Sequence, residues 1–335
     1  MLKNLFLYSL LATVCFAQAL PVKRYIPPTT TQPTTQATNS LQKELDEKGI
    51  LRLPWGVTKF NQKIVVRSEQ SIVGEGFGST LQWEGTEPYG IEFGDTGPVF
   101  FYRAALKNFT LTNGGIKVNK LSQRCVFENI WIDRAKEDGI LMLNPVGERL
   151  VFNTCWINQS KRNGITLSTT DGVNGIHFLN CNVQNNGCSG IVIEANAQTA
   201  QIQDTKIENC TIQGNRQLDQ GAAIVVRGYV TRMTVEDGWI EDVYGTGILV
   251  ESKTFKDVRR PLDFRIQGML MISLAKDPVI FKDCYRPRIE SLIVSPYVAT
   301  VKWKGDYAQP VGAMLGLSVF QIEEITEETL PTIQK

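Results

Sequence analysis

The sequence predicts an all-β solenoid in which every coil contributes three short strands. The main observation is a pattern that recurs between about residues 124 and 251: a bulky apolar residue, a small or apolar residue three positions later, and a β-branched aliphatic two positions after that. The clear copies begin at Phe127, Phe152, Phe178, Ile207 and Val235, with weaker copies at Leu106, Ile266 and Ile289. Their intervals of 21 to 31 residues are typical of a solenoid that stacks similar units.

A second marker keeps the same period. A small residue followed by isoleucine occurs at Gly115, Gly139, Gly164, Gly190, Ala223 and Gly247. Apolar residues then alternate, as in Ile191 and Ile193, and a period of two indicates a β-strand. Helical spacing is absent between these strands, so the repeat predicts one elongated domain for most of the 335 residues.

Charge excludes one class of partner. The chain has 35 basic and 34 acidic residues, a net charge of +1, and no basic stripe of the kind that nucleic acid requires. Apolar residues make up 42% of the sequence, which is enough for a hydrophobic core. We therefore expect no nucleic-acid partner.

The N-terminus predicts export. Lys3 precedes an apolar run from Leu5 to Ala17, and Ala17-Gln18-Ala19 is a small-x-small cleavage pattern. The run is too short to span a bilayer, so residues 1–19 are interpreted as a signal peptide, after whose cleavage no segment would cross a membrane. The alternative is an apolar docking peptide on a part of a virion. Residues 20–39 are rich in threonine and proline and predict an extended linker.

A capping segment begins at residue 40. Ser40 is placed to cap a short helix that ends at Gly49. It is followed by Leu53-Pro54-Trp55-Gly56, Ile64-Val65-Val66 and Gly74-Glu75-Gly76-Phe77-Gly78-Ser79-Thr80. This series resembles the N-terminal part of right-handed parallel β-helix proteins of the pectate-lyase-like superfamily, and the resemblance extends over about residues 41–305.

The resemblance implies the architecture. Residues 40–310 would form a right-handed parallel β-helix of about 8 to 10 coils behind a short capping helix. Residues 311–335 would add a C-terminal rung or cap and a tail. Within each coil, the Gly-Ile strands correspond to the first sheet, the Phe or Ile strands to the second and the Cys-x-Ile strands to the third. The superfamily includes polysaccharide lyases, glycoside hydrolases, epimerases and phage tailspikes, and the motifs do not identify the branch.

Two internal ladders are expected. Many β-helices stack asparagines at the bend between the second and third strands, and Asn129, Asn180, Asn209 and Asp237 occupy it here, with Thr154 interrupting the row. We interpret these residues as structural. Cys155, Cys181 and Cys210 share one inward position on consecutive rungs, where free thiols are favoured over a disulfide between neighbouring rungs.

Three outward residues of the first sheet are the candidate catalytic group. Glu194, Arg227 and Glu251 occupy the same position on successive rungs, which places the two carboxylates about 9.6 Å apart. That separation suits the acid and base of an inverting glycosidase. The row also resembles the arrangement by which lyases of the superfamily hold calcium-bound uronates. The alternative is a salt-bridge ladder.

Other catalytic classes lack support. The sequence has no G-x-S-x-G or H-E-x-x-H motif, and its single histidine, His177, is expected to point outward from the second sheet. The Asn-Thr-Asp, Gly-His-Gly and Asp-Pro-His motifs of known enzyme branches are also absent. Whether the protein is an enzyme therefore stays open. No cofactor follows from the residues, and calcium is the one metal that the resemblance suggests.

Tryptophans are the candidate substrate-binding residues. Trp131, Trp156 and Trp239 lie between inward residues of the third sheet and should point outward, with Trp131 beside Trp156. Exposed aromatic rings stack on sugars, although packing beneath a loop is an equally good explanation. Asp219 is a further candidate substrate-binding residue, because it lies in a turn near the first sheet. Asp138, Asp237 and Asp242 are interpreted as solvated turn residues.

A neighbouring outward row of the first sheet is apolar. Its members are Leu141, Thr166, Val192, Val225, Leu249 and Ile280. Such a strip rarely faces water, so either loops such as 144–149, 169–174 or 216–221 or another subunit should cover it. Because phage tailspikes use β-helix flanks for trimer contacts, the resemblance adds a homotrimer as an expectation.

These observations lead to two functional hypotheses. The first is an exported polysaccharide lyase or glycoside hydrolase of acidic sugars, which would be secreted, periplasmic or at the cell surface. The second is a non-catalytic carbohydrate-binding, adhesion or viral tailspike protein, which would be carried on a virion if the N-terminal run is not a signal peptide.

Overall fold

The structure is a computed structural model that describes residues 38–94, 103–119, 124–145, 148–197, 199–215, 222–252, 261, 263–274, 277–295, 299–304 and 320–324. The chain divides into Met1–Thr31 and Gln32–Lys335, and every described residue belongs to the second unit. The predicted signal peptide, nearly all of the linker, and Asp219 lie outside the described residues, as does the C-terminal tail except for 320–324.

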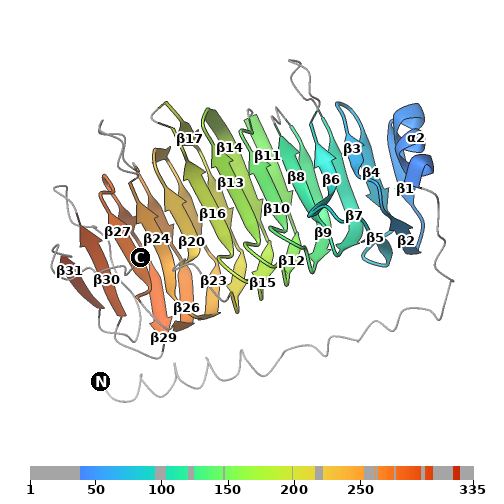
Figure 1. Ribbon diagram of the computed structural model, residues 1–335. Helices are drawn as coiled ribbons and strands as arrows, with labels where there is room; N and C mark the ends of the chain where they lie inside the picture. Colours follow the sequence, from blue (N-terminus) through green and yellow to red (C-terminus); the bar gives the residue numbers. More distant parts are fainter. Residues whose placement is uncertain are drawn as a thin grey trace. The chain divides into compact units, whose positions relative to one another are not determined.

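The described residues form a parallel β-helix of about eight turns, as predicted (Figure 1). The strands of the first sheet make an 11-stranded sheet, in which each strand pairs in parallel with the strand of the next coil. They are β3 (Ile64–Val66), β6 (Tyr89–Phe93), β8 (Gly115–Asn119), β10 (Ile140–Leu143), β13 (Ile165–Thr169), β16 (Ile191–Ala195), β20 (Ala222–Arg227), β24 (Thr246–Glu251), β27 (Val279–Lys282), β30 (Ala299–Lys304) and β31 (Phe320–Glu324).

The second and third strands of each coil share one 20-stranded sheet, because the chain bends between them without breaking the ladder of hydrogen bonds. The first half runs through β1 (Ile50–Leu53), β2 (Gly56–Phe60), β4 (Ser71–Gly74), β5 (Ser79–Trp83), β7 (Ala105–Thr112), β9 (Val126–Asp133), β11 (Glu148–Asn153), β12 (Trp156–Asn158), β14 (Gly172–Leu179) and β15 (Asn182–Gln184). The second half comprises β17 (Gln201–Gln203), β18 (Lys206–Glu208), β19 (Thr211–Gln213), β21 (Val230–Thr231), β22 (Thr234–Glu236), β23 (Trp239–Val243), β25 (Arg265–Gln267), β26 (Met269–Leu274), β28 (Arg288–Ile289) and β29 (Leu292–Ser295).

The helix α2 (Thr38–Lys48) covers the N-terminal end of the β-helix, and it begins two residues before the predicted cap at Ser40. Gly49 ends it as predicted, with a positive φ of 71° and a hydrogen bond from its N–H to the Leu45 carbonyl. The Gln42 side chain accepts a hydrogen bond from the N–H of Val65 (2.8 Å) and donates one to its carbonyl (3.1 Å). One amide thus occupies the place of a neighbouring strand at the edge of β3.

The predicted bend ladder is confirmed. Each of its residues, together with Asn108 at the start of the row, has a φ between 50° and 59°, a conformation that asparagine and aspartate tolerate well. Asn129 donates to Asn108 (3.0 Å) and Asn209 to Asn180 (2.7 Å). At the interruption, Asn180 donates to Asn153 instead (3.1 Å), so the adjacent residue substitutes for the amide that Thr154 lacks.

The interior holds one ladder of rings and one of thiols. Phe127, Phe152 and Phe178 stack with centroids 4.4 and 5.0 Å apart. Cys155, Cys181 and Cys210 lie inward, and each thiol donates to the carbonyl of the phenylalanine of an earlier strand, at 3.4 to 3.5 Å. All six cysteines of the described residues are free and buried, which agrees with the predicted thiol ladder.

Candidate functional site

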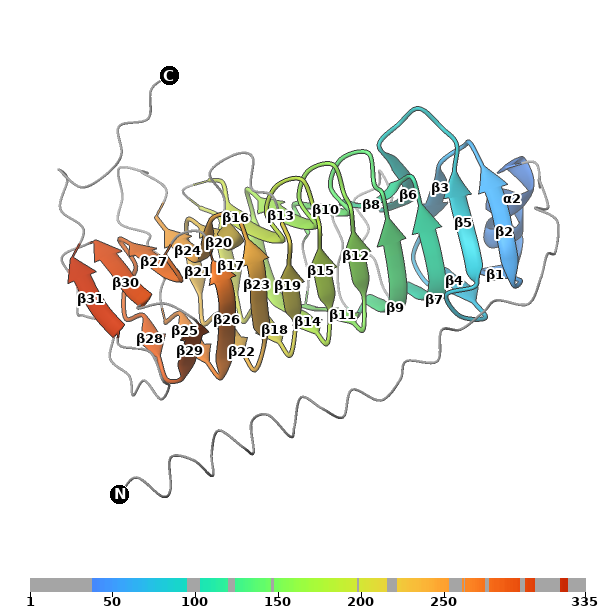
Figure 2. The ribbon, with the colours of Figure 1, turned by 90° about the horizontal axis from the view of Figure 1, so that it is seen from below.

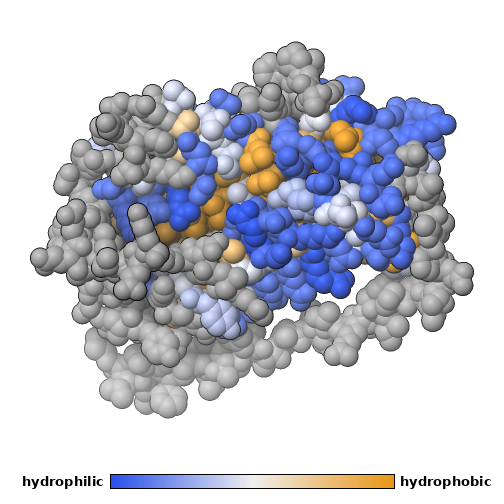
Figure 3. Space-filling view, viewed as in Figure 1, coloured by the Kyte–Doolittle hydropathy of each residue, from blue (hydrophilic) through white to orange (hydrophobic). Residues whose placement is uncertain are grey.

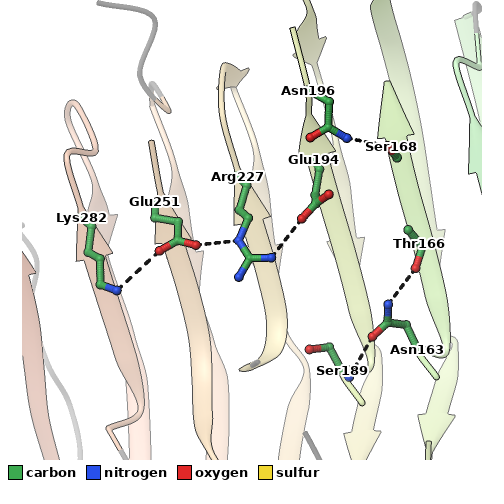
Figure 4. A network of polar contacts seen from close by, with 9 residues as sticks. All are labelled: Asn163, Thr166, Ser168, Ser189, Glu194, Asn196, Arg227, Glu251 and Lys282. Carbon is green, nitrogen blue, oxygen red and sulfur yellow. Dashed lines mark hydrogen bonds and ion pairs between the residues drawn. The ribbon is translucent and has the colours of Figure 1, made fainter. Parts of the chain in front are cut away.

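The first sheet carries a row of alternating charges on its outer face. Glu194, Arg227 and Glu251 pair in register as predicted, and Lys282 follows Glu251 on the next strand. Arg227 donates to Glu194 (3.0 Å) and to Glu251 (2.5 Å), and Lys282 lies 3.4 Å from Glu251 (Figure 4). We call these four residues the charged row.

The geometry of the charged row is that of a salt-bridge ladder. Arg227 lies between the two carboxylates, where a sugar would have to lie if one acted as acid and the other as base. Burial disfavours the charged guanidinium of Arg227, but the hydrogen bonds that it donates to Glu251 and Glu194 outweigh this effect and raise its pKa. The row is therefore charge-balanced and internally paired. A catalytic role for these residues stays a prediction.

Polar contacts continue beyond the charged row. The Asn196 amide donates to the Ser168 hydroxyl (2.5 Å), and Asn163 donates to Thr166 (3.0 Å) (Figure 4). Ser168 is the register partner of Glu194, so the row passes from charged to neutral polar side chains toward the N-terminus. The polar contacts on the outer face of the first sheet thus extend from Lys282 on β27 to Thr166 on β13.

The central part of the apolar strip beside the charged row is buried within one chain. Val192 and Leu249 are each 7% exposed and Val225 is 1% exposed, and the three pack with the buried Ala222. Figure 3 shows the hydrophobic side chains gathered over the 11-stranded sheet between hydrophilic flanks. This burial favours cover by the chain itself. The predicted covering loop at residues 216–221 lies outside the described residues, and a homotrimer stays a prediction.

Two other expectations have clear outcomes. His177 does point outward, in register with Lys206, and burial together with that lysine lowers its pKa.

The interpretation of Asp138 as a solvated turn residue is wrong, because the residue is 1% exposed. Its carboxylate accepts a hydrogen bond from the N–H of Asn163 (3.0 Å) on the next coil, and burial raises its pKa. The sequence did not reveal this because the neighbouring coils, rather than the turn, bury it.

We call the third strands of the coils, which form one side of the 20-stranded sheet, the third sheet. Its outer face carries the predicted tryptophans, on strands that lie side by side in Figure 2. Register pairing aligns five residues on β9, β12, β15, β19 and β23, which we call the aromatic row: Trp131, Trp156, Asn182, Thr211 and Trp239. The predicted contact between Trp131 and Trp156 is confirmed, with ring centroids 5.4 Å apart. Trp239 lies three rungs from Trp156, or about 14 Å.

A third ring completes an aromatic cluster. Phe77, from the turn after β4, packs at 5.9 Å from Trp131 and 6.0 Å from Trp156. Trp156 remains 38% exposed, and Trp131 and Trp239 are half-buried. The cluster combines the two explanations that the sequence left open: Trp131 packs beneath a turn, and Trp156 presents a platform to solvent.

A polar row lies beside the aromatic row, two residues further along each strand. It consists of Asp133, Asn158, Gln184, Gln213 and Glu241. Asn158 donates to Asp133 (2.8 Å) and Gln213 to Glu241 (3.3 Å). The side-chain amide of Gln184 hydrogen-bonds to no other described residue. Sequence reasoning missed this row, although the same alternation that aligned the tryptophans could have found it.

Unpaired polar atoms concentrate in the aromatic row. Among the described residues, seven buried side-chain nitrogen or oxygen atoms lack a hydrogen-bond partner. Three of the seven belong to this one row: Trp131 Nε1, Asn182 Oδ1 and Trp239 Nε1. An unpaired buried polar group costs about 1–3 kcal/mol, so the aromatic row carries three groups that reduce stability unless water or a ligand pairs with them.

Within the described part of the chain, no group of three or more His, Cys, Asp or Glu side chains is arranged to hold a metal ion. Calcium therefore stays an expectation from the resemblance alone. The single helix of the described residues, α2, is neither long nor apolar enough to cross a membrane.

Comparisons with known proteins agree on the fold. The right-handed β-helix region family matches residues 77–206. ORF18 of Geobacillus virus E2 superposes with a TM-score of 0.66 at 13% identity, over 87% of this chain and 60% of that protein. The A-module of the Azotobacter vinelandii mannuronan C-5 epimerase AlgE6 gives 0.60 at 12% identity, over 88% and 97%.

A phage protein is also similar. Tailspike protein 2 of the Escherichia coli O157:H7 bacteriophage CAB120 gives a TM-score of 0.57 at 13% identity, over 92% of this chain and 46% of the tailspike. The chain thus spans less than two thirds of either viral protein. No curated protein matches the sequence. The chain has the right-handed parallel β-helix fold, and these likenesses identify no branch of the proteins that share this fold.

Proposed function

We propose that this β-helix protein binds polysaccharide through the outer face of its third sheet. The observation that carries the proposal is the cluster of Phe77, Trp131 and Trp156, in which one ring supports another and Trp156 stays 38% exposed. An indole held in place in this way loses little conformational entropy when a sugar ring stacks on it.

The neighbouring rows supply the second part of a sugar site. Aromatic platforms give affinity, and a few polar groups beside them give orientation. The polar row offers amides and carboxylates along the same strands, each one rung of about 4.8 Å from the next. A linear polymer can follow such a repeat over several rungs.

The similar structures support the substrate class. One is named for mannuronan, a polysaccharide, and another is a phage tailspike. Because the likeness is of fold, it says only that β-helices serve such ligands. The proposal places the protein outside the cell or on a virion, where polysaccharides of this kind are found. It leaves the predicted trimer as a further expectation.

The test is binding of the full chain to a panel of polysaccharides by affinity electrophoresis. We expect retardation by at least one polysaccharide, and loss of at least tenfold in affinity for Trp156→Ala. Tyr244→Ala is the matched control, since Tyr244 is 69% exposed but lies on a bend outside the two rows. Equal losses in both variants, or no binding by the parent chain, would refute the proposal.

Catalysis on the first sheet is a second candidate function. The observation that favours it is that two partly exposed carboxylates flank an arginine. They could act as acid and base on an acidic sugar if Arg227 moved to bind the uronate. We expect an enzyme of this kind to release reducing ends or unsaturated products, with calcium as a variable. Glu194→Gln and Arg227→Ala should abolish that release, whereas release that persists in both variants would exclude the charged row.

A further inference from the structure

We infer that the polysaccharide is an uncharged chain that lies along the axis of the β-helix, with the polar row reading its hydroxyl groups. The inference rests on the proposed function and specifies the ligand of the same surface. It depends on the direction, chemistry and charge of the aromatic and polar rows.

Direction follows from the pairing register. Both rows run across the strands, through the same five strands from β9 to β23. Four rung steps cover about 19 Å. Trp131 and Trp156 lie at one end and Trp239 at the other, so aromatic contacts are available at both ends of an oligosaccharide several residues long. A ligand lying along the strands would meet only one of these ends.

Chemistry at the centre of the surface favours hydroxyl groups. Between the two aromatic ends lie Asn182 and Thr211 in one row and Gln184 and Gln213 in the other. The Asn182 Oδ1 atom is buried without a partner, and the Gln184 amide bonds to no other described residue. A primary amide both donates and accepts hydrogen bonds, as a sugar hydroxyl does. Small side-chain rotations would therefore let these amides pair with the hydroxyl groups of a sugar.

Charge argues against an acidic sugar. Of the ten side chains in the two rows, all of them described, Asp133 and Glu241 are acidic and none is basic. Arg134, on the adjoining turn, is bound to Asp133 at 2.7 Å, whereas Glu241 forms no ion pair with another described residue. A uronate or sulfate would approach like charge here. An uncharged ring would meet no such repulsion.

Neighbouring carboxylates also suit neutral sugars directly. Asp133 accepts from Asn158 (2.8 Å), and Glu241 accepts from Gln213 (3.3 Å). Each carboxylate has acceptor capacity left for a hydroxyl donor, and hydrogen bonds to a charged acceptor are the stronger kind. Asp133 and Glu241 would therefore strengthen binding of a neutral chain and weaken binding of an acidic one.

The test compares hexasaccharides of glucose, galactose and mannose with the corresponding hexuronic acids, by titration calorimetry at low ionic strength. We expect a neutral hexamer to bind at least tenfold more tightly than its uronic counterpart, and the gap to narrow as salt is added. A trisaccharide of the same sugar should bind more weakly than the hexasaccharide, because it cannot reach both aromatic ends of the surface.

Substitutions separate the two rows. Glu241→Gln should raise affinity for the hexuronic acid by about fivefold or more, without a comparable gain for the neutral hexamer. Gln184→Ala should lower affinity for the neutral hexamer by about tenfold, with a melting temperature close to that of the parent chain. Glu290→Gln, which removes a charge from the second sheet, is the control and should change neither affinity.

The outcomes distinguish this inference from the proposed function. If hexuronic acids bind more tightly than neutral hexamers, and Trp156→Ala abolishes that binding, the surface is a polysaccharide site but the inference is wrong. An unchanged affinity for both sugars in Glu241→Gln would also overturn it. If no neutral or acidic saccharide binds, the proposed function itself fails.

Discussion

Replacing Arg227 with methionine removes the central cation of the charged row and keeps most of its aliphatic length. The structure shows two ion pairs to Arg227, with side-chain exposures of 31% for the arginine, 19% for Glu194 and 21% for Glu251. Pairs this sheltered lie between exposed pairs, worth up to about 1 kcal/mol, and buried pairs, whose disruption costs about 3–5 kcal/mol. We expect the free energy of unfolding to fall by about 2 kcal/mol.

A matched control tests whether the low solvent exposure of the Arg227 ion pairs accounts for the expected loss of stability. Arg232 binds both oxygens of Asp204, at 2.6 and 2.7 Å, but its side chain is 55% exposed. Arg232→Met should therefore lower the free energy of unfolding by less than about 1 kcal/mol, although the ion pair that it removes is bidentate. Unfolding in urea at low and high salt would measure both variants. Salt should weaken the Arg232 pair more than the pairs of Arg227.

The comparison also decides between the two interpretations of the charged row. A double-mutant cycle of Glu194→Gln with Arg227→Met should give a coupling energy of about 1 kcal/mol if the row is a ladder. No loss of stability in Arg227→Met, together with complete loss of an activity that the parent chain shows, would refute the ladder. It would make Arg227 a residue that serves a substrate.

Three further perturbations test the fold and its electrostatics. Gln42→Ala should cost about 1–3 kcal/mol in chemical unfolding, because both backbone groups of Val65 lose their partner; an effect near zero would mean that α2 does not protect this edge. Phe152→Ala should cost about 3–5 kcal/mol, because it leaves a cavity in the middle of a stack of three rings; a loss below 1 kcal/mol would mean that the stack collapses around it. Burial raises the pKa of Asp138, so the folded state binds its proton more tightly than the unfolded state, and stability falls as pH rises above the unfolded pKa of about 4. Asp138→Asn should flatten that decline in a pH series of melting temperatures, and an unchanged slope would contradict the assignment.

The sequence was sufficient to predict the fold, because the repeat determines both where the strands lie and which side chains align between coils. One inward pattern per coil predicts the strands, and the structure shows the repeated inward residues Phe127, Phe152 and Phe178 with their rings stacked. A constant offset from the repeated inward residues placed Trp131 beside Trp156 and aligned Glu194 with Arg227 and Glu251. In a solenoid, the offset of a residue from the repeated marker corresponds to a position in space, and this is why these predictions are confirmed.

Features that depend on turns could not be predicted in this way. Phe77 reaches the tryptophans from a turn whose path no period describes, and Asp138 is buried by the coils around its turn rather than by its own segment. Lys282 was within reach of the alignment, because it follows Ile280 by two residues as Glu251 follows Leu249. Without it, the sequence left open both an acid–base pair around an arginine and a salt-bridge ladder.

The most direct test of the account is to locate a bound saccharide by crystallography of the full chain with the hexasaccharide that binds most tightly. The account predicts sugar density over Trp156 and along the polar row, running across the strands toward Trp239. Density beside Glu194 and Arg227, with the third sheet bare, would contradict it and would place the site on the first sheet.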